Sequence, residues 1–86
     1  MDDDAIQARI DELEEEERRL RREEEESAEA GRTDVVSQDA EQLRAIKVEL
    51  DQLWDLLRQR RARRSAGLDP DDAETRDPST VEGYRQ

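Results

Sequence analysis

The side chains of this sequence that could carry out chemistry are its carboxylates, because the 86 residues include neither His nor Cys. A carboxylate becomes a useful general acid or base when burial or a neighbouring like charge shifts its pKa. Helical periodicity instead places most of the 26 acidic residues on solvated helix faces, and Ser27, Ser37 and Ser65 have no evident base partner. The sequence therefore predicts a protein without enzymatic activity, cofactor or small-molecule substrate.

The acidic run Glu23–Glu26 is the densest candidate for a metal site. Side chains along one helical turn point outward around the axis, and no loop has the ligand spacing of a calcium site. The absence of Cys also excludes thiolate metal sites. We therefore expect no bound metal, and we interpret the run as a solvated stretch of helix.

The strongest candidate for a binding function is a cluster of arginines at the end of the second predicted helix. Such a cluster could neutralise the phosphates of a nucleic acid, contact a protein partner, or pair with Asp2–Asp4 and the acidic tail. Pairing within the chain is the favoured interpretation. A net charge of −11 and the lack of interleaved aromatic residues make nucleic acid the least favoured. The cluster consists of Arg58, Arg60, Arg61, Arg63 and Arg64.

Charge divides the chain into three parts. Residues 2–29 carry 14 acidic and 5 basic residues, residues 34–66 carry 6 and 7, and residues 67–86 carry 6 and 2. A chain with 48% charged and 2% aromatic residues is typical of disorder unless a helical period organises it. No apolar run is long enough for a bilayer, and the acidic start is unsuitable for a secretory signal. We therefore expect a cytoplasmic protein with no membrane contact.

A heptad-like apolar spacing organises most of the chain into two predicted helices. The first helix, 3–29, has a seam that fades because Glu17 and Glu24 occupy seam positions. The second helix, 38–66, has an uninterrupted seam that becomes cationic in its last turn. The apolar seam residues are Ile6, Ile10, Leu13 and Leu20 in the first helix and Leu43, Ile46, Leu50, Leu53 and Leu57 in the second.

A break over residues 30–37 separates these helices. Gly31 suits the left-handed position that follows a helix. Ser37 is the favoured N-cap of the second helix, and Asp34 is the alternative. Gly67 ends the second helix.

Residues 67–86 contain few apolar groups, so we expect a flexible tail. Within it, Asp69 and Pro70 could begin a single helical turn. Val81–Tyr84 is either an anchor on the hairpin or a short binding motif, and the sequence does not decide between the two.

The two seams are complementary if the helices fold back antiparallel. Pairing residues whose position numbers add to 63 sets Ile10 against Leu53, whereas a slip of one heptad sets Leu13 against Leu57. We prefer the first register because the slip leaves Ile10 opposite Arg60. The preferred pairs are Ile6–Leu57, Ile10–Leu53, Leu13–Leu50 and Leu20–Leu43.

A lone two-helix hairpin of this size is only marginally stable. Trp54 and Leu56 flank the seam of the second helix and would remain partly exposed in a monomer. Two hairpins packed as a bundle would cover them, so we predict a homodimer or another protein partner at the second helix. The predicted partner-binding residues are Leu50, Leu53, Trp54, Leu57, Arg58, Arg60, Arg61 and Arg64.

The block Asp51–Ala62 and the motif Val81–Tyr84 resemble a domain-of-unknown-function family of short bacterial helical proteins. The segment Val48–Leu50 fits the same pattern, and the likeness covers nearly the whole chain. Two positions depart from it, because Arg18 stands where His is expected and Leu53 where Cys is common. The resemblance implies a small helical protein and gives no established activity, substrate or catalytic residue.

Together these patterns predict an all-α fold, an antiparallel two-helix coiled-coil hairpin with a largely disordered acidic C-terminal tail. The leading functional hypothesis is a non-enzymatic interaction module that self-associates through its second helix. One alternative is a regulator of the transcription machinery that acts through an acidic hairpin tip, with Glu23–Glu26, Asp34 and Asp39 near the turn. The other is a nucleic-acid-associated protein that uses the arginine cluster.

Overall fold

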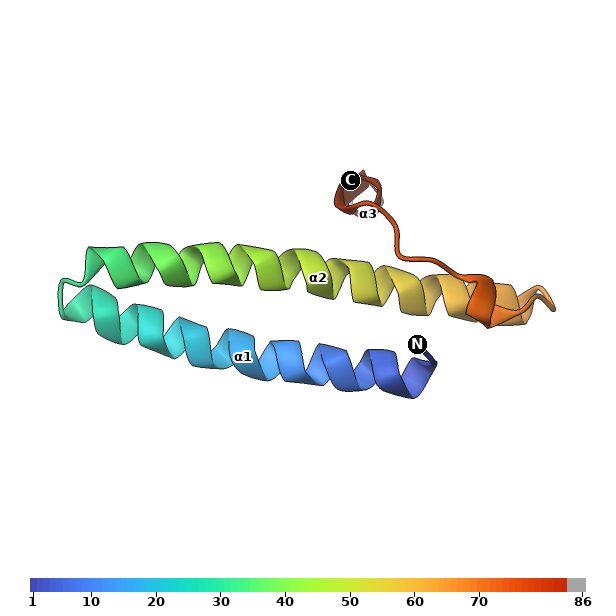
Figure 1. The fold of residues 1–86 in the computed structure, drawn as a ribbon, viewed down its shortest axis with the longest axis horizontal. Coiled ribbons are helices and arrows are strands. Elements are labelled where there is room, and N and C mark those ends of the chain that lie inside the picture. The colour runs from blue at the N-terminus through green and yellow to red at the C-terminus, as the bar shows by residue number, and fades with distance from the viewer. Residues whose placement is uncertain (84–86) are drawn as a thin grey trace.

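Two long antiparallel helices dominate the computed structural model, which describes residues 1–83. α1 runs Asp3–Glu29 and α2 runs Thr33–Ser65. They lie side by side in a molecule with extents of 55 × 26 × 15 Å (Figure 1). Two short helices follow, η1 at Pro70–Asp72 and α3 at Pro78–Gly83. The predicted all-α hairpin is confirmed, and the described residues contain no strand.

α1 begins where the sequence predicts because Asp2 caps it. The Asp2 carboxylate accepts a hydrogen bond from the backbone N–H of Ala5 at 2.8 Å. Asp3 and Asp4 add negative charge at the positive end of the helix dipole. At the other end of α1 the chain turns at Gly31, whose φ of +74° is the left-handed conformation that glycine adopts without steric cost.

α2 begins at Thr33, inside the predicted turn, so the expected N-cap at Ser37 is wrong. Ser37 is an exposed residue within the helix, and the preceding Arg32 makes no side-chain capping hydrogen bond. Val35 and Val36, whose β-branched side chains lower helix propensity, are partly buried in the first turns. Packing near the turn therefore outweighs local propensity at the start of α2.

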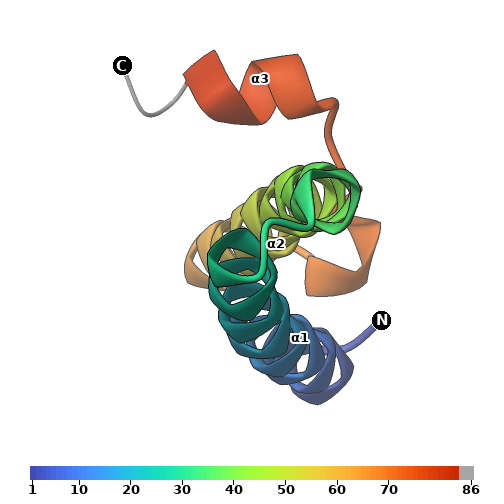
Figure 2. The same cartoon turned by 90° about the vertical axis from the view of Figure 1, so that its left-hand side faces the viewer.

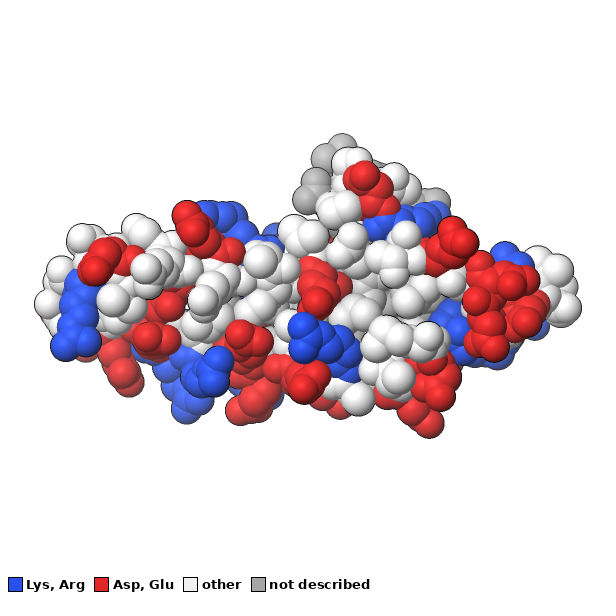
Figure 3. Space-filling view, in the orientation of Figure 1, with Lys and Arg blue, Asp and Glu red and all other residues white. Residues whose placement is uncertain are grey.

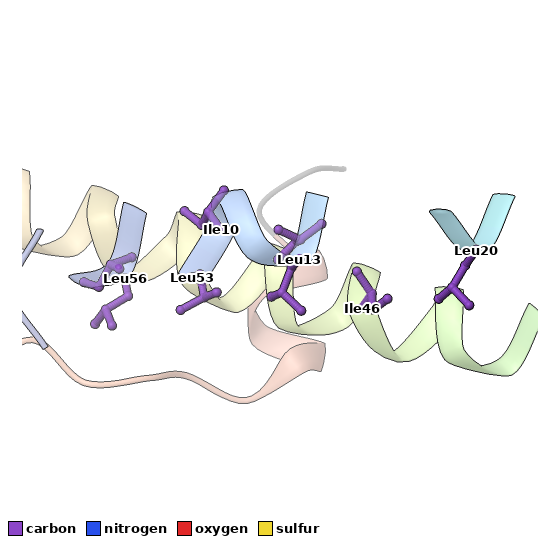
Figure 4. Close-up of a cluster of buried hydrophobic side chains, with 8 residues drawn as sticks. Ile10, Leu13, Leu20, Ile46, Leu53 and Leu56 are labelled. Atoms are coloured by element: carbon purple, nitrogen blue, oxygen red, sulfur yellow. The ribbon is translucent and has the colours of Figure 1, made fainter. Parts of the chain in front are cut away.

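A hydrophobic core runs along the contact between α1 and α2 (Figure 4). In this view Ile10 lies level with Leu53. Beyond this end of the core, an ion pair joins Asp3 to Arg60 at 2.5 Å. Both relationships fit the register in which position numbers add to 63. The core consists of Ile6, Ile10, Leu13, Leu20, Ile46, Leu50, Leu53 and Leu56, with Leu43 and Leu57 partly buried against it.

Leu56 is buried, although the sequence pattern predicts that it stays partly exposed. Leu56 belongs to the core against which Ala73 of the tail packs, and η1 contacts α2. A bare hairpin lacks the contacts that the tail makes with this core. Trp54, by contrast, is 38% exposed, as expected for a residue that flanks the seam.

The described part of the tail returns along α2. Figure 2 shows α3 on the side of α2 that faces away from α1. η1 is the helical turn expected after Asp69, whose carboxylate accepts a hydrogen bond from the N–H of Asp71 at 2.9 Å. Val81 is fully buried and α3 contacts α2, which favours an anchor over an exposed binding motif. Tyr84, the last residue of that motif, lies outside the described residues.

Candidate partner-binding site

The structure divides the predicted partner-binding residues between the interior and the surface of the hairpin. Leu50 and Leu53 are core residues, and Leu57 is partly buried beside them. Arg60 is also buried, whereas Arg64 is exposed and ion-paired. The other exposed members of the set are Trp54, Arg58 and Arg61.

Arg60 and Arg64 pair with the start of α1. Arg60 Nε donates to Asp3 Oδ1 at 2.5 Å, and Arg64 Nη2 donates to Asp3 Oδ2 at 2.6 Å. Arg60 Nη1 also donates to the Asp71 carboxylate at 3.0 Å and to the Pro70 carbonyl at 3.1 Å. The hydrogen bonds from Arg64 and then from Arg60 lower the pKa of Asp3 to about 2. These two arginines are therefore held within the chain.

Trp54 lies in an exposed basic stripe of α2. At about 100° per residue, Lys47, Arg58 and Arg61 fall within roughly 40° of Trp54 around the helix axis, and the partly buried Asp51 lies about 60° from it. Lys47 and Arg61 make no ion pair with any described residue, and Arg58 reaches Asp55 only at 4.0 Å. We call Lys47, Trp54, Arg58 and Arg61 the Trp54 stripe.

Charges elsewhere on the surface are mixed. Figure 3 shows acidic and basic side chains interspersed along the hairpin, and an acidic patch at the end of the molecule that carries η1. On α1, Arg18 Nη2 lies 2.6 Å from a Glu15 oxygen, and Arg21 Nη2 lies 3.6 Å from a Glu17 oxygen. These ion-paired cations of α1 contrast with the cations of the Trp54 stripe.

A second site, which the sequence pattern did not indicate, lies on the face of α2 that carries the tail. Asp55 is fully buried there, and its Oδ2 accepts hydrogen bonds from Arg76 Nε and Gln59 Nε2, each at 2.9 Å. Arg76 Nη2 donates to the other carboxylate oxygen. The hydrogen bonds from Arg76 lower the pKa of Asp55, although burial acts in the opposite direction. Helical periodicity alone places Asp55 on a solvated face, so the sequence carries no clear signal for this site.

Side chains of α2 also hold the tail by its backbone carbonyl groups. Gln52 Nε2 donates to the carbonyl of Arg76 at 3.1 Å, and Gln59 Nε2 donates to that of Glu74 at 2.7 Å. Arg63 Nε donates to a carbonyl just before η1 at 2.6 Å. Contacts of this kind fix the path of an extended segment whatever its side chains. We call Gln52, Asp55, Gln59, Arg60 and Arg63 the tail-binding face.

The half of the hairpin nearest the turn has polar residues in its interior. Ser27 of α1 and Asp39 of α2 are both buried, and Asp39 Oδ2 has no hydrogen-bond partner in the structure described. Asp34 is exposed beside the turn. Of the two aspartates expected at an acidic tip, only Asp34 is therefore presented to solvent.

No group of three or more acidic, Cys or His residues within the described part of the chain is placed to hold a metal ion. The described helices also include none that is long and apolar enough to cross a bilayer. A side-chain hydrogen bond is the largest cause of each pKa shift that is resolved for a described carboxylate. Among the described residues, every carboxylate with a shifted pKa is shifted downward, and these are Asp3, Glu15, Asp55 and Asp77.

These features define a class of small all-α proteins in which a helical hairpin carries a tail along its second helix. The chain belongs to the family described as protein of unknown function (DUF2630), whose model matches residues 2–86. The family membership suggested by the sequence motifs is thereby confirmed.

Similar proteins occur in mycobacteria. Uncharacterised proteins of Mycobacterium bovis and of two strains of Mycobacterium tuberculosis are each 58% identical to this chain over 48 residues. The match covers 56% of this chain and 55% of each relative, so the chain spans about half the length of the curated relatives it matches. No solved structure matches the chain.

Proposed function

We propose that this protein is a non-enzymatic interaction module that self-associates through the Trp54 stripe of α2. The observation that supports this proposal is the 38% exposure of Trp54. Every residue of the tail-binding face lies about 100° or more from Trp54 around the helix axis, so the described part of the tail leaves the Trp54 stripe open. Exposed tryptophan and arginine together are typical of residues that dominate protein–protein binding energy.

A second copy of the chain has the charge that the Trp54 stripe requires. Residues 2–29 carry 14 acidic and 5 basic residues, a net charge of −9. The cations of the Trp54 stripe would approach such an acidic helix favourably. In a dimer with two-fold symmetry each copy contributes both surfaces, so the two contacts form together. A homodimer is therefore the assembly that we propose.

The pKa shifts support a role without catalysis. A carboxylate that serves as a general acid near neutral pH needs a raised pKa, whereas hydrogen bonding from Arg76 lowers that of the buried Asp55. The buried Asp55 is held by a structural ion pair. We therefore assign the protein no reaction.

The alternative functions have weaker support. An acidic tip that probes the transcription machinery would use Asp34 and Asp39, and Asp39 is 5% exposed. A nucleic-acid site would use the arginine cluster, but Arg60 of that cluster already donates hydrogen bonds to Asp3 and to Asp71 of η1. The Trp54 stripe needs no rearrangement of the hairpin to be reached.

Sedimentation equilibrium of the wild-type chain and of Trp54→Ala tests the proposal. We expect a wild-type dimer at high micromolar concentration, weaker association of Trp54→Ala, and weaker association in high salt because the cations are exposed. Leu68→Ala is the matched control, since Leu68 is 53% exposed and lies outside the Trp54 stripe. A wild-type monomer at high micromolar concentration would refute self-association.

A further inference from the structure

The tail-binding face of α2 has the properties of a site for an extended peptide. We propose that it binds an arginine-containing segment of another protein, and that the chain's own residues 69–81 are its intramolecular occupant. This site is separate from the Trp54 stripe, so the inference goes beyond the proposed function and does not depend on it.

Selectivity for arginine comes from Asp55. Its carboxylate is fully buried, and it takes hydrogen bonds from both Nε and Nη2 of Arg76. A planar guanidinium can present two parallel donors to one carboxylate, whereas a lysine ammonium cannot reproduce that geometry. Gln59 donates to the same carboxylate at 2.9 Å and orients it. The Asp55 carboxylate is therefore oriented to accept two hydrogen bonds from an arginine side chain.

The amide groups on either side of Asp55 hold the main chain of the bound segment. Gln52 precedes Asp55 by about one helical turn and Gln59 follows it by another, so the three side chains share one face of α2. The amide nitrogen of Gln52 donates to the carbonyl of Arg76 at 3.1 Å, and that of Gln59 donates to the carbonyl of Glu74 at 2.7 Å. Recognition therefore requires an arginine with extended backbone on either side of it. It depends little on the other side chains of the bound segment.

The tail occupies this face as a tethered ligand. Its connection to α2 passes through Gly67, whose φ is +74° and around which a Cβ would meet no atom within 4 Å. The contacts that hold the tail are mostly polar, apart from the buried Val81 and the partly buried Ala73. A short tether gives an effective concentration on the order of millimolar. A partner segment therefore binds when its local concentration or its affinity exceeds that of the tail.

A labelled peptide of residues 68–83 tests the proposal on the full-length chain. In the chain with Arg76→Gln and Val81→Asp, the tail loses its arginine and its buried anchor, and we expect saturable peptide binding by fluorescence anisotropy. The wild-type chain should bind the peptide much more weakly because its tail competes. We call the chain with Arg76→Gln and Val81→Asp the released chain. Adding Asp55→Asn to it should weaken peptide binding roughly 10- to 100-fold, the effect of losing charge-assisted hydrogen bonds. A peptide carrying Arg76→Gln should show the same loss, and Lys47→Gln in the Trp54 stripe is the matched control that should show none.

Two results would overturn the proposal. One is equal binding of the two peptides, or of chains with and without Asp55→Asn. The other is no binding at millimolar peptide while circular dichroism shows an intact hairpin.

A measurement on the wild-type fold covers the case in which the released chain unfolds. The Arg76 Nε–H should give a slowly exchanging NMR resonance that Asp55→Asn abolishes. A rapidly exchanging Arg76 Nε–H in the wild-type chain would equally refute the site.

Discussion

Asp3 and Arg60 join the first turn of α1 to the last turns of α2. Arg60 Nε donates to Asp3 at 2.5 Å, and Arg60 Nη1 donates to Asp71 of η1 at 3.0 Å. A single buried guanidinium thus links three segments that are far apart in the sequence. Removing one partner of a buried charge is costly, so this contact couples the docking of the tail to the closure of the hairpin.

Acid should destabilise the fold through Asp3. Hydrogen bonds from Arg64 and Arg60 lower its pKa from 3.8 to about 2. A carboxylate whose pKa is lowered by folding stabilises the fold above its unfolded pKa, and that contribution disappears as pH falls through the folded pKa. We expect the free energy of unfolding, measured by urea titration, to fall between about pH 4 and pH 2. Asp3→Asn should reduce this dependence.

Asp4→Asn is the matched control for the acid titration. Asp4 is an exposed acid in the same helical turn, with no ion pair to a described residue. An Asp3→Asn chain with the wild-type pH dependence would show that the contact with Arg60 and Arg64 does not form.

Replacing Asp39 by leucine should stabilise the hairpin. Asp39 is 5% exposed, and its Oδ2 has no hydrogen-bond partner in the structure described. An unsatisfied buried polar group costs about 1–3 kcal/mol, so Asp39→Leu should raise the melting temperature by several degrees. Asp34→Leu, at an exposed position near the turn, should change it little. A lower melting temperature for Asp39→Leu would mean that the carboxylate has a partner in solution.

Ile10→Ala should be among the most damaging substitutions. Ile10 is fully buried in the core between α1 and α2, and truncating such a side chain costs about 2–5 kcal/mol. Leu68→Ala, at a side chain that is 53% exposed, should stay within about 0.5 kcal/mol of wild type. Urea denaturation followed by helical circular dichroism measures both, and similar losses for the two variants would argue against the core described here.

Gly31→Ala should destabilise the turn by about 1 kcal/mol through the backbone alone. The φ of Gly31 is +74°, and no atom lies within 4 Å of the position that a Cβ would take. Steric contact is therefore excluded as the cause. Gly31→Asn should cost less in thermal melts, because asparagine tolerates the left-handed region better than alanine. Equal losses for alanine and asparagine would point to another origin.

The parts of the fold that depend on local and periodic physics follow from the sequence. The spacing of Ile6, Ile10 and Leu13 against Leu50 and Leu53 predicts the hairpin and its register, because a stripe of apolar residues has to be buried against another such stripe. The cap at the start of α1 and the left-handed glycine after α1 each depend on only a few neighbouring residues. Both can therefore also be predicted from the sequence.

The tail-binding face shows what such patterns miss. Asp55 and Arg76 are 21 positions apart and belong to no shared periodic pattern. Composition marks the tail as flexible, but hydrogen bonds from α2 to its carbonyl groups depend on where the backbone passes, and residue types do not encode that path. Leu56 likewise belongs to a core against which Ala73 of the returning tail packs, although the apolar spacing leaves Leu56 off the seam.

By itself, the sequence determined a helical hairpin with an acidic first helix and a second helix rich in arginine, because periodicity and charge are properties of the residues in order. Only the tertiary structure decided which arginines are held inside the chain and which stay available. Arg60 lies within reach of Asp3 and Asp71, and Arg61 lies on the open side of α2. Arg60 and Arg61 differ by less than one third of a turn around the helix axis. The packing of α1 and the tail against α2 determines which of the two is buried.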